Sequence, residues 1–163
     1  MALRTYLDFA ENDYNYFRQS YEHGIVANAM AADAQEICEK YMKHVIDQYY
    51  MAASMEEQAE YETVMRPHNL LKLVKFIEGK MGISLSAEMK NDLRSINGYY
   101  FTARYPGDES IEVTRDDLEL CMKAVTSCRD EIYRQMELPG RKLPPRARSV
   151  SYTHLRAHET LRH

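Results

Sequence analysis

Three basic side chains, Arg104, Lys40 and Lys43, are the residues best suited to bind an anionic ligand. A guanidinium pairs with phosphate through two parallel hydrogen bonds, whereas an ammonium supplies a point charge. We expect Arg104, at the end of a tyrosine-rich helix, to bind a nucleotide phosphate or an acidic group of a partner protein. The alternative is a helix-terminal arginine that neutralises the negative end of the helix dipole and pairs with Asp108.

Glu39 and Lys43 are four residues apart, so they lie on one face of a helix. They form either a surface salt bridge, which contributes only about 0.3 kcal/mol, or a polar rim of the same cleft as Arg104. Tyr105 and Asp108, which lie close to Arg104 in the sequence, complete the predicted ligand-binding set.

The histidines divide into two groups. His44 is expected to be solvated or partly packed, and His68, at a helix start, is expected to cap the helix or to pack against it. His154 and His158 have the spacing of two metal ligands on one helix face. However, residues 150–160 read VSYTHLRAHET, which resembles the translation of a transposon adapter used for sequencing libraries. Residues 149–163 are therefore predicted to be an artefact that replaces the true C-terminus, and neither a metal site nor a cofactor is predicted.

Apolar residues at three- and four-residue spacing predict the elements that must position these side chains. Ser86 is a suitable N-cap, and Thr114 with Asp117 has the form of a capping box. Residues 51–66 lose the periodicity and are either a frayed helix or a loop. The pattern predicts an all-α, five-helix, up-and-down bundle in residues 1–138, with helices over about residues 5–23, 25–50, 67–81, 86–105 and 114–138. A basic, proline-containing tail follows in residues 139–148.

Composition limits the classes of function. Residues 1–140 contain 15 Lys and Arg against 24 Asp and Glu, a net charge of −9, and this argues against non-specific binding to nucleic acid. No apolar run approaches the roughly 18 residues of a membrane span, so we expect a cytoplasmic protein without membrane contact. Three cysteines without CxxC spacing, Cys38, Cys121 and Cys128, are expected to be reduced and buried.

Three segments, in order, resemble the HEPN domain (higher eukaryotes and prokaryotes nucleotide-binding). They are AADAQEICEKYMKHVI, with its small residues, glutamine and Glu-Lys pair; RPHNLLKLVKFI, with histidine at a helix start; and LRSINGYYFTARYPGD, whose tyrosine-rich helix leads into Arg-Tyr-Pro. The resemblance spans residues 13–137. It implies a five-helix bundle that often forms homodimers, and members that bind nucleotides or partner small nucleotidyltransferases.

The resemblance also implies that the catalytic histidine of the family's ribonucleases is missing. Active HEPN ribonucleases carry an arginine followed, after four to six residues, by a histidine. Arg104 matches the arginine, but Glu109, Ser110 and Ile111 occupy the positions where the histidine would fall. A glutamate would repel phosphate, and the other two side chains do not exchange protons near neutral pH. We therefore expect a non-ribonucleolytic binding module.

Two other hypotheses remain open at this point. One is a ribonuclease toxin with a rearranged site that uses Arg104 and either His44 or His68. The other is a structural interaction domain without a small ligand. Thirteen tyrosines, against four phenylalanines and no tryptophan, indicate either a dimer or partner surface or the edges of an amphipathic core.

Overall fold

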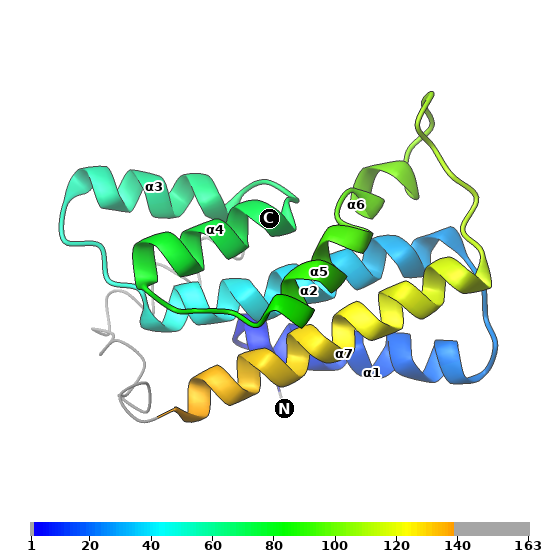
Figure 1. The fold of residues 1–163 in the computed structure, drawn as a ribbon, viewed down its shortest axis with the longest axis horizontal. Helices are drawn as coiled ribbons and strands as arrows, with labels where there is room; N and C mark the ends of the chain where they lie inside the picture. The colour runs from blue at the N-terminus through cyan, green and yellow to red at the C-terminus, as the bar shows by residue number, and fades with distance from the viewer. Residues whose placement is uncertain (1, 139–163) are drawn as a thin grey trace.

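The computed structural model describes residues 2–138, and the regular structure in that range is entirely helical (Figure 1). The helices are α1 (Tyr6–Glu22), α2 (Asn28–Tyr49), α3 (Met55–Met65), α4 (Leu70–Met81), α5 (Ala87–Ile96), α6 (Tyr99–Thr102) and α7 (Arg115–Glu137). The predicted all-α class is confirmed. The predicted number of five helices is wrong, because the described range contains six helices of at least 10 residues and the 4-residue α6. The proposed tail and the adapter-like segment lie outside the described residues.

Helix α2 forms the centre of the bundle and contacts α1, α7, α4, α5 and α6. The helices α1, α2 and α7 lie side by side, and each of α2, α3, α4 and α5 runs opposite to the helix before it (Figure 1). Ile37, Tyr41 and Val45, which recur every four residues along α2, are each at most 2% exposed. The apolar stripe that predicted this helix is therefore the middle of the hydrophobic core.

The same helix also buries polar side chains, because neighbours surround it on most of its faces. Gln35 and Asp47 are fully buried, and Glu39 is 2% exposed. Buried polar groups require partners, and Asp47 accepts a hydrogen bond of 2.9 Å from the Tyr61 hydroxyl of α3. The polar face of α2 thus fixes the segments that pack on it.

The helix predicted over residues 86–105 is interrupted. It ends at Ile96, and α6 begins only at Tyr99. Gly98 lies between them with φ of +108°, a conformation that L side chains rarely adopt. The break turns the tyrosine-rich segment toward α2, so the prediction of one continuous helix is wrong at the point that positions Arg104.

The segment between α2 and α4 also differs from expectation. The undecided residues 51–66 contain α3, which is capped by the Ser54 side chain at Glu57 N. Pro67 precedes α4 rather than beginning it, because Asn69 is the residue whose side chain accepts hydrogen bonds from the first helical amides. The predicted caps at Ser86 and Thr114 are both confirmed.

Two predictions drawn from composition can be compared with the structure. Cys38, Cys121 and Cys128 are free and buried, as expected. In the part of the chain that the structure describes, no helix combines the length and the apolar character needed to cross a bilayer.

Candidate functional site

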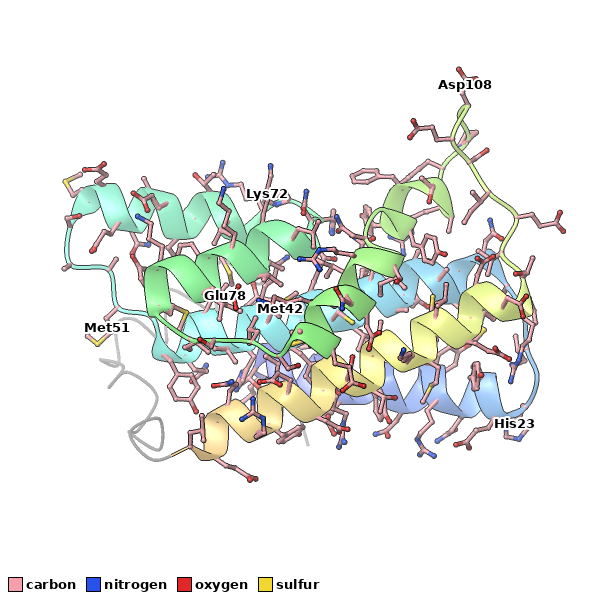
Figure 2. The ribbon with its side chains drawn as sticks, viewed as in Figure 1. His23, Met42, Met51, Lys72, Glu78 and Asp108 are labelled. Carbon is pink, nitrogen blue, oxygen red and sulfur yellow. The ribbon has the colours of Figure 1, made fainter. Side chains whose placement is uncertain are left out.

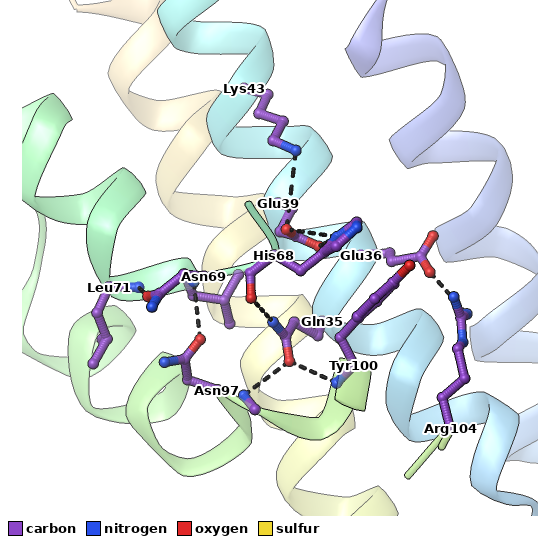
Figure 3. Close-up of polar contacts among 12 residues, drawn as sticks. Gln35, Glu36, Glu39, Lys43, His68, Asn69, Leu71, Asn97, Tyr100 and Arg104 are labelled. Atoms are coloured by element: carbon purple, nitrogen blue, oxygen red, sulfur yellow. Dashed lines mark hydrogen bonds and ion pairs between the residues drawn. The ribbon is translucent and has the colours of Figure 1, made fainter. Parts of the chain in front are cut away.

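Tyr100 lies at the centre of the candidate site, between His68 and Arg104 (Figure 3). The His68 imidazole stacks on the Tyr100 ring with the centroids 3.5 Å apart and the planes 12° apart. The Arg104 guanidinium carbon lies 4.5 Å from the centroid of the same ring, within the range of a cation–π contact. The structure therefore brings together a histidine and an arginine that are far apart in the sequence.

One buried side chain, Gln35, holds the two segments that carry these residues. Its Nε2 donates a 2.9 Å hydrogen bond to the His68 carbonyl oxygen. Its Oε1 accepts hydrogen bonds of 2.9 Å from the backbone N–H groups of Gly98 and Tyr100. Asn97 adds a second tie, because its Oδ1 accepts a hydrogen bond of 2.9 Å from Leu70 N. Gln35 thus satisfies amides that the break at Gly98 removes from helical hydrogen bonding.

Glu39 connects the histidine to the predicted lysine. His68 Nδ1 lies 3.2 Å from both carboxylate oxygens of Glu39, and Lys43 Nζ lies 3.9 Å from Glu39 Oε1 (Figure 3). Burial raises the pKa of Glu39 and lowers the pKa of Lys43. The i, i+4 pair forms as predicted. The alternative of a surface salt bridge does not fit, because Lys43 is only 8% exposed.

Arg104 is paired with carboxylates of α2. One of its terminal nitrogens lies 2.8 Å from Glu36 Oε1 and 3.6 Å from Asp33 Oδ1. Burial alone would lower the pKa of Arg104, but the Glu36 charge and hydrogen bond outweigh it and raise that pKa. The alternative pairing with Asp108 is not what the structure has, because Asp108 lies at the tip of the loop that precedes α7 (Figure 2).

Lys40 also has a carboxylate partner, Asp13 of α1. A groove of about 260 Å³ runs between α1 and α2 and is lined by Asn12, Asp13, Tyr16, Asp33 and Glu36. It joins the partner of Lys40 to the two partners of Arg104. Burial and the neighbouring Glu36 charge raise the pKa of Asp33. This side of the site is therefore acidic.

Tyr105 lies at the exposed end of the site and is 50% exposed. Its ring centroid lies 6.2 Å from that of Tyr100 and 6.3 Å from that of Phe101. Among the predicted residues, Arg104, Tyr105, Glu39 and Lys43 are thus connected through Tyr100 and His68. Lys40 faces α1, and Asp108 has no part in this cluster.

Sequence reasoning missed four members of the cluster: Tyr100, Gln35, Glu36 and Asp33. The signal available was spacing, because Asp33, Glu36 and Lys40 recur every three or four residues along one face of α2. A second cavity, of about 430 Å³, lies between the start of α5 and α7 and contains none of the predicted site residues. Within the described residues, no group of three or more His, Cys, Asp or Glu side chains is arranged to hold a metal ion.

Comparison with known proteins gave one match. The sequence profile of the HEPN domain matches residues 3–134, which is most of the chain. No curated protein sequence and no solved structure matches it.

Proposed function

The chain belongs to the HEPN domain family, and from that premise we propose that it is a non-ribonucleolytic binding module whose ligand is a protein partner. The observation that best supports this proposal is that each predicted phosphate-binding cation has a carboxylate beside it. Arg104 pairs with Glu36 and Asp33, while Lys40 and Lys43 pair with Asp13 and Glu39, respectively.

These pairs oppose the binding of a nucleotide at Arg104. A phosphate there would approach the carboxylates of Glu36 and Asp33. Two like charges 4 Å apart near a protein surface repel by about 4 kcal/mol. A partner protein that brings its own cation to Glu36 avoids this repulsion. Of the two ligands that the family resemblance implies, a nucleotidyltransferase partner is therefore favoured over a free nucleotide.

A second candidate function has one specific observation in its favour. Glu39 contacts His68 at Nδ1, so Nε2 is the ring nitrogen that does not face this carboxylate. His68 and Arg104 contact the same Tyr100 ring. This arrangement supports a ribonuclease with a rearranged site, in which the histidine comes from the start of α4 and not from the loop after Arg104.

A cleavage assay on a structured RNA separates the two functions. The proteins compared are the wild type, Arg104→Ala and His68→Ala, with Arg94→Ala as a control on the exposed face of α5. We expect no protein to cleave RNA above background. Cleavage by the wild type that is lost in both Arg104→Ala and His68→Ala, and kept in Arg94→Ala, would overturn the binding-module proposal.

Thermal shift with ATP and GTP distinguishes the two ligands, because a ligand that binds the folded state raises its stability. We expect no shift for the wild type. We expect a positive shift for Glu36→Gln, in which Arg104 loses its nearest carboxylate. A wild-type shift that disappears in Arg104→Ala would replace the protein partner with a nucleotide.

We also expect the homodimer that the family resemblance implies. Large apolar side chains are exposed on several elements, among them Tyr16 of α1 (68%) and Leu120 of α7 (44%). Light scattering coupled to gel filtration measures the mass directly, and a monomer at all concentrations would contradict this expectation.

A further inference from the structure

An aromatic patch extends outward from the site. We use this name for Phe101 and Tyr105, which are 54% and 50% exposed, together with Tyr100 and His68 beneath them. Phe101 packs edge-on against Tyr100 at 5.0 Å and against His68 at 6.3 Å, measured between ring centroids. Adjacent exposed aromatic rings are typical of a surface that a partner covers.

The surroundings of the aromatic patch are acidic. On one side lie Asp33 and Glu36, which flank Arg104 at the groove between α1 and α2. On the other side is the protruding loop that follows Tyr105, in which Asp108, Glu109 and Glu112 are exposed (Figure 2). Arg104, the cation in contact with the patch, is already paired. The patch therefore combines an apolar centre with a negative border.

The apolar centre and negative border favour one class of ligand for the patch over the others. A two-fold contact with a second copy would place the same carboxylates opposite each other. A nucleic acid would bring phosphates toward them. A protein segment with cations around an apolar side chain would instead match both the border and the centre, because Arg and Lys also stack on aromatic faces.

We propose that the aromatic patch docks a basic, apolar segment of a protein partner, with Arg or Lys side chains on the acidic border and an apolar side chain on Phe101 and Tyr105. This inference rests on the proposed binding function and adds the surface and the chemistry of the partner.

The test uses two short capped peptides as probes, Arg-Leu-Trp-Leu-Arg and the acidic counterpart Glu-Leu-Trp-Leu-Glu. Their binding to the whole chain is followed by ¹H–¹⁵N NMR titration, and a ten-nucleotide oligouridine is the third probe. We expect the basic peptide to shift the amide signals of residues 99–112. We expect Phe101→Ser to weaken that binding by about tenfold, which is typical of the loss of a central aromatic contact.

Two further variants locate the effect. The double variant Asp108→Lys with Glu109→Lys reverses the charge of the exposed loop. It should weaken binding of the basic peptide without affecting the core. Met55→Ser removes an apolar side chain that is 91% exposed at the start of α3, away from the patch, and should leave the affinity unchanged.

Several results would overturn the proposal: no shifts with the basic peptide, equal shifts with the acidic peptide, shifts of residues 99–112 with oligouridine, or a concentration-dependent dimer that Phe101→Ser abolishes. Failure of the proposed function is distinguishable from these outcomes. RNA cleavage that depends on Arg104 and His68 would refute the binding module itself. If the RNA stays intact in the cleavage assay and the peptide titration fails, only the proposed docking surface is refuted.

Discussion

Replacing Gln35 by methionine tests whether one amide holds the candidate site together. Methionine matches the length of glutamine but neither donates nor accepts the hydrogen bonds in question. The variant loses the bonds to His68 O, Gly98 N and Tyr100 N, each 2.9 Å long. At about 1 kcal/mol of net stability for each bond, Gln35→Met should lower the free energy of unfolding by about 3 kcal/mol.

The matched control is Gln135→Met on α7. Gln135 is also buried, at 3% exposed, and its Nε2 donates to Ser84 O at 2.9 Å. Its hydrogen bonds join α7 to Ser84 and to Glu131 of the same helix, so this variant should lose stability while the amide signals of Gly98 and Tyr100 stay unchanged.

The assay is urea unfolding followed by circular dichroism, combined with ¹H–¹⁵N NMR of the folded variants. We expect the Gly98 and Tyr100 amide signals to move in Gln35→Met only. A loss below about 0.5 kcal/mol, the lower limit for one hydrogen bond, would refute the reasoning. Unmoved Gly98 and Tyr100 signals in Gln35→Met would refute it as well.

Three other predictions concern stability and pH. Gly98→Ala should lower the free energy of unfolding by about 2 kcal/mol, because φ at this position is +108°, although an added Cβ meets nothing within 4 Å. Gly79→Ala, inside α4 and with equally open space around the Cβ, should instead raise the free energy of unfolding by about 0.7 kcal/mol. Equal effects of the two substitutions in urea unfolding would contradict the strain argument. Thr114→Ala removes the cap at Asp117 N and should lower the thermal midpoint, at a cost of about 1 kcal/mol; an unchanged midpoint would show that water replaces the cap. Burial opposes but does not outweigh the hydrogen bonds from Arg129 and Tyr41 that lower the pKa of Glu11 below 4.5. Its stabilisation is therefore complete above about pH 4.5 and is lost as the pH falls through the folded-state pKa. Glu11→Gln should flatten the stability profile in that acid range, and parallel profiles for the two proteins would exclude this role.

The helices were largely predictable, because their signals are local. The four-residue rhythm of Ile37, Tyr41 and Val45 and the caps at Ser86 and Thr114 depend on a few neighbouring residues, and each was confirmed. The break at Gly98 was not predictable, because the residue that stabilises it, Gln35, is more than 60 positions earlier in the chain. Within the window 86–105 the apolar spacing favours an uninterrupted helix.

The candidate site was only partly predictable for the same reason. Arg104 and Lys43 could be chosen by residue type, and the Glu39–Lys43 pair could be chosen by spacing. Their electrostatic state could not, because it depends on which carboxylates the fold brings near. Glu36 of α2 pairs with Arg104, which follows the end of α6, and this contact is the reason that we propose a protein ligand rather than a phosphate.

Gln35 also has a thermodynamic consequence. Its amide bonds at once to the segment before α4, through His68, and to the start of α6, through Gly98 and Tyr100. The two segments therefore cannot shift independently without breaking one of these bonds. A partner that displaced α6 would change the free energy of the His68 segment, and any change at His68 would alter affinity at α6 by the same coupling energy. Two surface segments distant in the chain thus share one energetic link through the interior.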